Sequence, residues 1–368
     1  MSNIIILGAA RSFCQPGQRN DQQDSRFPDY DTPREGERSF VVCDGVGGEA
    51  DGAIASSTVA KAFGEFMAGY ADPAYVFTIH DFQDALNFAY HKLMKVVGQS
   101  RSHMATTLTF LHFNADNAIV AHMGDSRVYQ IRPKVGIMYR TSDHSLVNAM
   151  VHAGTITPEE AIDHPKSNVI TRCMTYTEPG AIPSAADMIT ITDVAPGDYF
   201  LLCTDGVLHQ IDDQYLLDLF SSDISDDEKI HSLAEISKDS TDNNTAIFVR
   251  VTDAPQSASI NGDTTLNEEI EPVAPANPCV YASSGEQYQQ EYPQHYEYPQ
   301  HDEYPQQQEY TQPDASCAGQ YDDYPGISTP RTRTAPLDTP QPAITQVTPD
   351  NSLPFFKRLS TRIRDLFS

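Results

Sequence analysis

Hydrophobic residues recur with two different spacings along the first 252 residues. Short apolar runs rich in β-branched residues predict buried strands, whereas apolar positions three and four apart predict amphipathic helices. Because several strands follow one another at short spacing, we expect antiparallel sheets flanked by helices, an α+β fold. The predicted strands cover residues 3–7, 40–43, 106–113, 118–123, 126–132, 187–192, 199–204 and 245–251, and the predicted helices 52–70, 81–97, 158–162, 214–220 and 226–237.

Two polar stretches interrupt this pattern. Residues 11–38 contain glycine, proline and many charged side chains, so they predict a loop. Residues 143–173 carry three histidines and the short helix 158–162, and they predict an excursion from the sheet. The pattern ends near residue 252, so residues 1–252 are expected to form one domain.

The composition changes abruptly after this domain. Residues 253–352 are dominated by Pro, Gln, Ser, Thr, Asp, Glu and Tyr, and contain a six-residue repeat whose copies begin at Glu291, Glu297, Glu303 and Glu309. Such a segment buries too little apolar surface to offset its ordering entropy. We therefore expect residues 253–352 to be a disordered acidic tail.

Residues 353–368 differ again, because they combine basic and apolar side chains at helical spacing. On a helix, Phe355, Leu359 and Ile363 fall on one face and Lys357 and Arg358 lie off it. A basic amphipathic helix of this kind is typical of docking to a membrane surface or to a partner protein. The alternatives are that it packs back on the domain or that it ends a tail of no defined role.

The net charge of −27 is unevenly distributed. Residues 253–352 hold 16 acidic residues against two arginines, a net charge of −14, whereas 353–368 carry four basic residues against one aspartate. The first 252 residues therefore carry −16. A body this acidic argues against nucleic acid as a partner.

The cysteines and the termini suggest the cellular setting. The six cysteines are scattered without a Cys-x-x-Cys pair, which argues against a thiolate zinc site. The apolar run at residues 4–7 is too short for a leader and has no basic flank, and no apolar run approaches about 20 residues. We expect a cytoplasmic protein, with peripheral membrane association through 353–368 as an option.

Two apolar strands end in the same dipeptide. One delivers Asp44-Gly45 and the other Asp205-Gly206. Carboxylates that meet at one end of a sheet usually bind a hard cation through oxygen. Asp24, Asp125 and Asp242 are further candidates by context, although each one alone is an ordinary turn residue.

These carboxylates lie within eight motifs that follow one another in a recognisable order. Together the motifs resemble those of the metal-dependent protein phosphatases of the PP2C type (PPM family), and eight in sequence order are far more specific than one. They are Gly17-x-Arg19-x-x-Gln22-Gln23-Asp24, Phe40–Gly48, Met104-Ala-Thr-Thr107, Gly124-Asp-Ser-Arg-Val-Tyr129, Thr141-Ser-Asp-His-Ser145, the stretch from His164 to Arg172, the stretch from Gly197 to Gly206, and Asp242-Asn-x-Thr245.

The resemblance implies a fold and a site. The expected fold is a four-layer α-β-β-α sandwich of two stacked antiparallel sheets. In the family one carboxylate bridges two Mn²⁺ or Mg²⁺ ions and the next glycine lends its carbonyl, roles that fall on Asp44 and Gly45. The remaining positions correspond to second-ion ligands (Asp205 and Asp242), a residue that holds metal-bound water (Asp24), a ligand of a third ion (Asp125) and the arginine that binds the substrate phosphate (Arg19).

The resemblance also implies a reaction. A hydroxide that bridges the two metals attacks phosphoserine or phosphothreonine directly, without a phosphoenzyme, so Asp44 and Arg19 are the expected catalytic residues. The expected partners are phosphorylated proteins and a cognate serine/threonine kinase, and we expect a monomer. The alternative is a catalytically weak or inactive member of the fold that binds phosphoproteins as a scaffold.

The chain departs from the family pattern at several positions. Gln22 and Gln23 replace the usual Asn and the frequent Glu, and Ala105 replaces Gly. Val46 stands where eukaryotic members carry a histidine proposed as general acid, which indicates a bacterial-type enzyme. Metal-bound water would then protonate the leaving oxygen, with His144 and His164 as weak alternatives.

Overall fold

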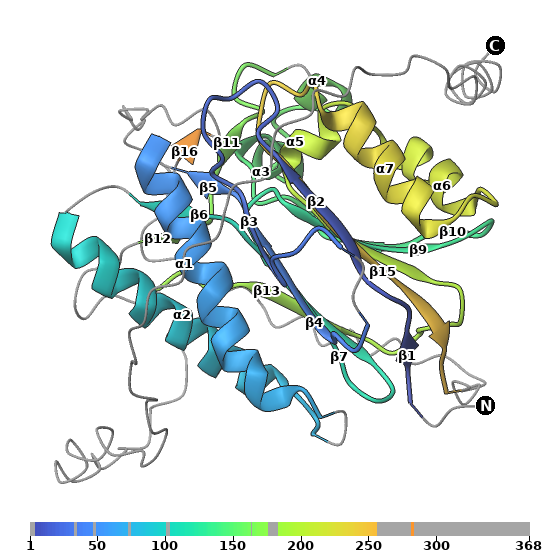
Figure 1. Cartoon of the computed structure of the whole chain (residues 1–368). Coiled ribbons are helices and arrows are strands. Elements are labelled where there is room, and N and C mark those ends of the chain that lie inside the picture. The colour runs from blue at the N-terminus through green and yellow to red at the C-terminus, as the bar shows by residue number, and fades with distance from the viewer. Residues whose placement is uncertain are drawn as a thin grey trace, which may run out of the picture. The chain divides into compact units, whose positions relative to one another are not determined.

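The computed structural model describes residues 4–32, 35–46, 49–72, 75–100, 104–162, 164–175, 183–255 and 281–282. The chain divides into a unit Met1–Pro293 and a unit Gln294–Ser368. All described residues belong to the first unit, so the account below concerns that unit alone. Figure 1 shows its arrangement of two sheets between two sets of helices.

The first sheet has five strands and is antiparallel throughout. Its strand order is β13-β8-β7-β4-β3. The chain enters this sheet through the edge strand β3. The inner strands β7 and β8 are neighbours and form a hairpin. The bounds are β3 (Ser25–Phe27), β4 (Ser39–Cys43), β7 (Leu108–Phe113), β8 (Ala118–Met123) and β13 (Asp187–Ile191).

The second sheet has six strands and is also antiparallel. Its order is β1-β15-β14-β9-β10, with β2 paired to the other end of the long strand β15. The bounds are β1 (Ile6–Leu7), β2 (Arg11–Gln15), β9 (Arg127–Arg132), β10 (Gly136–Arg140), β14 (Tyr199–Cys203) and β15 (Asn244–Asp253).

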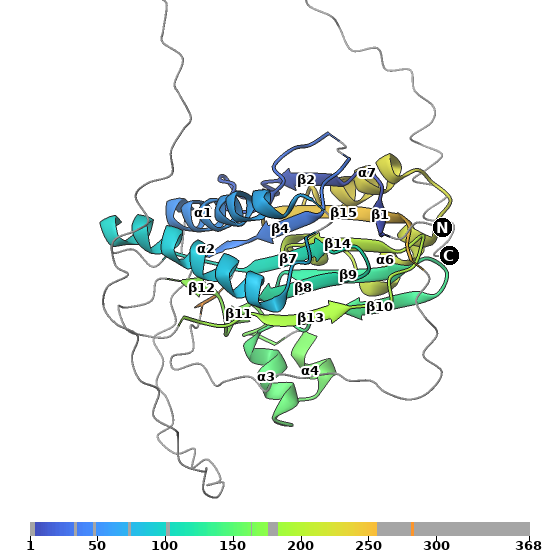
Figure 2. The same cartoon turned by 90° about the horizontal axis from the view of Figure 1, so that it is seen from below.

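Helices cover the outer face of each sheet. Helices α1 (Glu49–Met67) and α2 (Ile79–Ser100) cover the first sheet, and α6 (Asp213–Ser221) and α7 (Asp226–Ser237) cover the second. The turn of 3₁₀ helix Ala68–Tyr70 ends the first of these helices. The expected four-layer α-β-β-α sandwich is therefore confirmed, as Figure 2 shows from another side.

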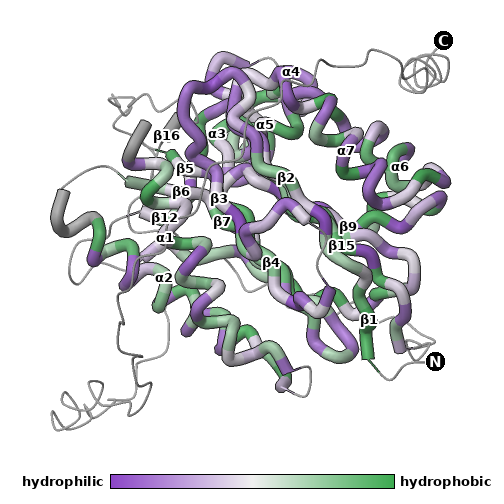
Figure 3. The backbone as a smooth tube through the Cα atoms, in the orientation of Figure 1, coloured by the Kyte–Doolittle hydropathy of each residue, from purple (hydrophilic) through white to green (hydrophobic). Residues whose placement is uncertain are grey.

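Strand alternation explains how one strand serves two cores. Side chains of a strand point alternately to its two faces, so Val41 and Cys43 pack under the helices while Phe40 and Val42 pack between the sheets. The core between the sheets also takes Phe200 and residues of β15 from the other side. Figure 3 shows hydrophobic residues along β4 and β7 and, at intervals, along the helices.

The remaining elements lie at one end of the sandwich. A three-stranded sheet joins β5 (Gly45–Val46), β6 (Ala105–Thr106) and β12 (Met174–Thr175). Residues 143–175, which we call the flap, contain α3 (Leu146–His152), α4 (Pro158–Ile162) and β11 (Val169–Ile170). The last described strand, β16 (Tyr281–Ala282), pairs with β11. The four-residue helix α5 (Asp205–Leu208) follows β14.

Most predicted elements are found within a few residues of their expected bounds, but several were missed, among them β2, β3, β10 and α3. The expected loop 11–38 contains β2 and β3, because each strand has too few apolar residues to show a period. Edge strand β10 was missed because none of its residues is fully buried. Helix α3 was hidden in a polar stretch, although Ser145 caps it by accepting a hydrogen bond from the Asn148 amide.

The tail predictions concern residues that are mostly outside the described ones. Two parts of the segment predicted to be disordered are described. Residues 253–255 form the end of β15 and the two residues after it, and Tyr281–Ala282 form β16. The repeat and the amphipathic helix at 353–368 lie outside the described residues. Among the helices that are described, none is both long and apolar enough to cross a membrane.

The aromatic core of the first sheet leads to a prediction about the free energy of unfolding. Phe110 is fully buried and its ring lies 5.1–5.7 Å from those of Phe63, Phe77 and Phe82. We expect Phe110→Ala to lower the free energy of unfolding by about 3–5 kcal/mol in urea titrations. Val135→Ala, at an exposed site, should change it by less than about 0.5 kcal/mol, and equal effects of the two would contradict this packing.

Candidate functional site

Asp44 leaves the end of β4 in a fixed position because threonines hold its backbone. Its carbonyl oxygen accepts hydrogen bonds from the Thr107 amide and from Thr106 Oγ1, both at 2.8 Å. Its own amide donates to Thr107 Oγ1 at 2.9 Å. Thr107 Oγ1 is also 2.8 Å from Ser126 Oγ, the neighbour of Asp125. The Thr-Thr pair therefore connects two of the predicted acidic positions.

The glycine after each strand-end aspartate allows a close backbone approach. A Cβ atom on Gly45 would lie 2.2 Å from the Gly52 carbonyl oxygen at the start of α1. A Cβ on Gly206 would lie 1.9 Å from the carbonyl oxygen of Asn243. Any larger residue would push these segments apart. The second contact brings the start of α5 against the Asp242 loop, so two of the predicted carboxylates come together.

Asp24 lies deepest in this group. It is 5% exposed, and its Oδ2 accepts a hydrogen bond from Thr204 Oγ1 at 3.0 Å. Thr204 directly precedes Asp205 and also accepts a hydrogen bond from the Thr245 amide. The end of β14, the start of β15 and the Asp24 loop are thus tied together. The structure places Asp24, Asp44, Asp205 and Asp242 at one end of the two sheets.

The pKa values show that these carboxyl groups act on one another. Loss of solvation and the charges of Asp205 and Asp242 raise the pKa of Asp24 from 3.8 to about 8. The pKa of Asp44 is raised well above its ordinary value by desolvation, then by Asp24, Asp205, Asp125 and Asp242. Desolvation also raises the pKa of Asp205, although the nearby His209 lowers it. Grouped carboxyls of this kind are characteristic of functional sites.

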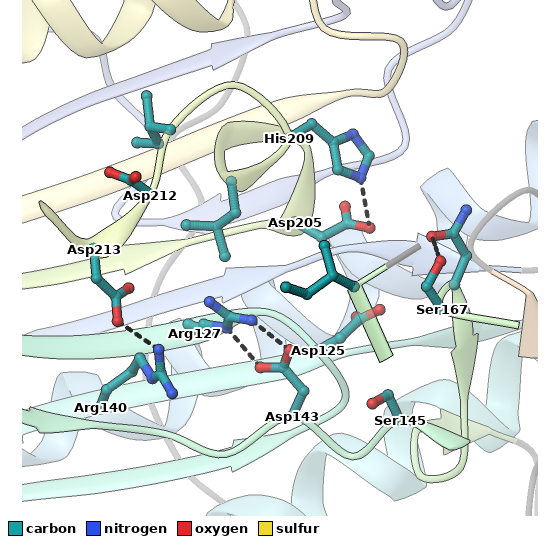
Figure 4. Close-up of a pocket in the computed structure, with 14 residues that line it drawn as sticks. Asp125, Arg127, Arg140, Asp143, Ser145, Ser167, Asp205, His209, Asp212 and Asp213 are labelled. Atoms are coloured by element: carbon teal, nitrogen blue, oxygen red, sulfur yellow. Dashed lines mark hydrogen bonds and ion pairs between the residues drawn. The ribbon is translucent and has the colours of Figure 1, made fainter. Parts of the chain in front are cut away.

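Asp125 joins the group from the turn before β9. It is 8% exposed, and its pKa is raised well above the ordinary value by desolvation and then by Asp205 and Asp143. Asp125 and Asp205 also line a pocket of about 550 Å³. Figure 4 shows both beside the pocket, with flap residues Ser145 and Ser167 across from them.

Arg19 contacts the acidic group at Asp242. Its Nη2 donates to Asp242 Oδ2 at 2.8 Å, and the side chain is 35% exposed. Its Nε is buried without a hydrogen-bond partner. The guanidinium is therefore held against one carboxylate of the group while part of it stays accessible, as a group that binds an anion requires.

The donor set fits divalent cations. The acidic side chains offer oxygen ligands only, which is the chemistry that Mg²⁺ and Mn²⁺ prefer. Asp24 Oδ1 and Asp205 Oδ1 are buried without a hydrogen-bond partner. Buried carboxylate oxygens of this kind are costly unless a cation satisfies them. The unpaired oxygens and the mutual repulsion are both relieved by positive charge at the centre of the group.

Two residues were named in motifs but given no role. Arg127 donates to both oxygens of Asp143 at 2.7 Å, and both residues line the pocket. This bidentate pair fixes the start of the flap to β9. The signal was present in the sequence, since both lie in the quoted motifs, but spacing alone does not pair them. His209, one turn after Asp205, was also missed, and its Nε2 lies 3.6 Å from Asp205 Oδ2.

The histidines considered for proton transfer have other contacts. Both ring nitrogens of His144 are engaged, one by the Gly124 amide and one by Asp187. His164 Nδ1 accepts a hydrogen bond from the Lys166 amide.

Gln23 contacts the glycine that follows Asp44. Its carbonyl oxygen accepts a hydrogen bond from the Gly45 amide, and its side-chain oxygen lies against Gly52.

Comparison with known proteins identifies the class. The family model described as protein phosphatase 2C matches residues 18–236, more than half of the chain. The chain belongs to the protein phosphatase 2C family, and it is a phosphatase of the bacterial type that the sequence motifs predicted.

Individual relatives agree with this assignment. The chain is 33% identical over 223 residues to protein phosphatase PhpP of Streptococcus pneumoniae, covering 58% of this chain and 85% of the relative. The structure of the Mycobacterium tuberculosis serine/threonine phosphatase PstP/Ppp matches with a TM-score of 0.55 and 26% identity, over 67% of this chain and all of that one. The PstP catalytic domain in complex with two manganese ions matches with a TM-score of 0.54 and 25% identity, over 67% and 99% of the chains.

The raised pKa of Asp24 predicts a pH dependence of the metal-free protein. Because the folded pKa of about 8 exceeds the unfolded value near 3.8, the folded state binds the extra proton and loses this stability as pH rises from 4 to 8. In EDTA, Asp24→Asn should therefore be more stable than the parent protein at pH 8 by at least about 1 kcal/mol, since one pKa unit corresponds to about 1.4 kcal/mol. Urea unfolding should show this gap shrinking at pH 5, and a gap independent of pH would contradict it.

Proposed function

We propose that this protein is a metal-dependent serine/threonine protein phosphatase that hydrolyses phosphoserine and phosphothreonine by direct attack of activated water. The observation that supports this most strongly is the group of five aspartates beside a pocket of about 550 Å³, in which burial and neighbouring carboxylates raise the pKa of Asp24, Asp44, Asp125 and Asp205. Its relatives named as serine/threonine phosphatases, and the manganese-bound PstP domain, support the same activity.

The acidic group is proposed to hold two or three Mn²⁺ or Mg²⁺ ions. Asp44 would bridge two ions and the Gly45 carbonyl would bind one of them. Asp205 and Asp242 would bind the second ion, Asp24 would hold its water, and Asp125 would bind a third. When bound, such cations lower the pKa of water and neutralise charge on a phosphoryl group.

The protein's own residues prepare this chemistry. Threonines fix the Asp44 backbone and the Gly206 contact fixes Asp205, so the carboxylates need not reorganise when a cation binds. Arg19 is proposed to bind the substrate phosphate, because its guanidinium is partly exposed beside Asp242 and its Nε lacks a partner. The pocket beside Asp125 offers space for residues that flank the phosphorylated side chain.

The alternative is a phosphoprotein-binding scaffold with little activity. All five acidic positions are present, which favours the enzyme. Phosphorylated proteins are the proposed substrates in either case, and a cognate serine/threonine kinase would supply them. A monomer suffices, since all proposed site residues come from one chain.

Hydrolysis of p-nitrophenyl phosphate tests the enzyme against the scaffold. We expect turnover with Mn²⁺ that EDTA abolishes, and a loss of ~10²-fold or more in kcat for Asp205→Asn, because one buried cation ligand is removed. Asp218→Asn, on the exposed face of α6, is the matched control and should keep the parent rate. Turnover that survives both EDTA and Asp205→Asn would exclude this mechanism.

The proposed domain division has a separate test. The last of the proposed site residues is Asp242, whereas β16 pairs with flap strand β11. A chain ending at residue 293 retains this pairing and should hydrolyse p-nitrophenyl phosphate within about twofold of the full chain, because no site residue is lost. A chain ending at residue 255 separates the contribution of β16. A large loss of activity in the chain that ends at residue 293 would show that the tail beyond it belongs to the catalytic domain.

A further inference from the structure

A second polar cluster lies outside the acidic group, where the flap leaves the sandwich. It consists of His122 at the end of β8, His144 at the start of the flap, Asp187 at the start of β13 and Arg172 at the end of the flap. We call these four residues the flap clamp. The side chain of His144 is only 9% exposed, so its contacts are with protein rather than with water.

His144 contacts three separate segments. Its Nδ1 accepts a hydrogen bond from the Gly124 amide at 3.1 Å, and its own amide donates to the Gly124 carbonyl oxygen at 2.9 Å. Its carbonyl oxygen accepts from the Thr171 amide at 2.7 Å, near the end of the flap. Its Nε2 lies 2.9 Å from Asp187 Oδ2. One residue thus links the turn before Asp125, both ends of the flap and the first sheet.

The other members of the clamp fix the orientation of the His144 ring. Since Nδ1 accepts a hydrogen bond, the ring proton is on Nε2, and Nε2 donates a hydrogen bond to Asp187. The second oxygen of Asp187 is held by Arg172 Nη1. His122 stacks on the His144 ring with centroids 4.4 Å apart, and its Nε2 lies 2.8 Å from the Ser142 carbonyl oxygen.

A metal ion bound by this cluster is the competing interpretation. His122, His144 and Asp187 each offer a ligand atom, and these atoms lie within 4.8 Å of one another. However, Asp187 and both nitrogens of His144 already have hydrogen-bond partners. Arg172 also places a positive charge on Asp187, which opposes a cation. The contacts therefore favour a positioning role over a metal site.

We propose that His144 is a positioning residue that orients the Gly124–Asp125 turn through Nδ1 and anchors the flap to the first sheet through Nε2. The first contact places the Asp125 carboxylate toward the acidic group. The second holds the flap, whose Ser145 and Ser167 line the pocket. The effect on cation binding rests on the proposed function, whereas the anchoring of the flap does not.

Two substitutions separate the two contacts. In His144→Asn the amide oxygen can replace Nδ1 as acceptor for Gly124 but cannot reach Asp187. In His144→Gln the amide nitrogen can replace Nε2 as donor to Asp187 but leaves the Gly124 amide without its acceptor. His152→Gln, at an exposed position of the same flap, is the matched control.

The first measurement is the rate of trypsin cleavage after the exposed flap residue Lys166, made in EDTA so that no cation is involved. We expect His144→Asn to be cleaved about fivefold faster than the parent, the effect of one lost hydrogen bond, and His144→Gln to be cleaved at nearly the parent rate. The second measurement is Mn²⁺ binding, followed by the electron paramagnetic resonance signal of the free ion. Here His144→Gln should raise the Kd of the most weakly bound Mn²⁺ ion about fivefold, whereas His144→Asn should leave that Kd unchanged.

The outcomes are distinct. The crossed pattern, with one variant altered in each measurement, supports the proposal. The proposal is overturned if the two variants behave like the parent protein. It is also overturned if they change equally in cleavage rate and in Mn²⁺ binding. Zn²⁺ that binds the parent protein and is lost equally in both variants and in Asp187→Asn would favour the metal site instead. If the parent protein binds no Mn²⁺, the proposed function fails, but the cleavage rates in EDTA still decide whether the flap is anchored.

Discussion

Mutual repulsion among buried carboxylates is the constraint on which the site depends. Asp24, Asp44, Asp125 and Asp205 each have a raised pKa, first because they lose solvation and then because they face one another. Left to itself, such a group would move apart or take up protons. The surrounding backbone prevents the first response, since threonines hold Asp44 and Thr204 holds Asp24. The metal-free folded chain therefore responds by binding protons, and positive charge at the centre of the group would relieve the same repulsion.

The sandwich supplies the rigidity that this requires. Phe40 and Val42 of β4 interlock with Phe200 and Leu202 of β14 in the core between the sheets. The two strands that deliver Asp44 and Asp205 are therefore fixed relative to each other by packing, not only by contacts at the site. Closely packed protein interiors transmit small displacements rather than absorbing them.

Much of this organisation could be predicted from sequence, for identifiable reasons. The strands that end in Asp44 and Asp205 are continuous apolar runs, so their position and type were clear. The convergence of the carboxylates was not deducible from spacing and came from the order of the motifs. Edge strands β2 and β10 carry too few buried residues to show a period. The Arg127–Asp143 pair and the contacts of His144 connect distant residues by side-chain geometry, which a one-dimensional pattern does not contain.

The acidic group takes its members from both sheets, and this has a consequence for how the protein can vary. Asp44 follows a strand of the first sheet, while Asp205 and Asp242 flank strands of the second. The distance between these carboxylates therefore depends on the thickness of the hydrophobic layer between the sheets. A substitution such as Val to Ile deep in that layer would change their spacing without altering any of the aspartates. For the cations proposed above, whose radii differ, the packing of the core would then contribute to the choice between them.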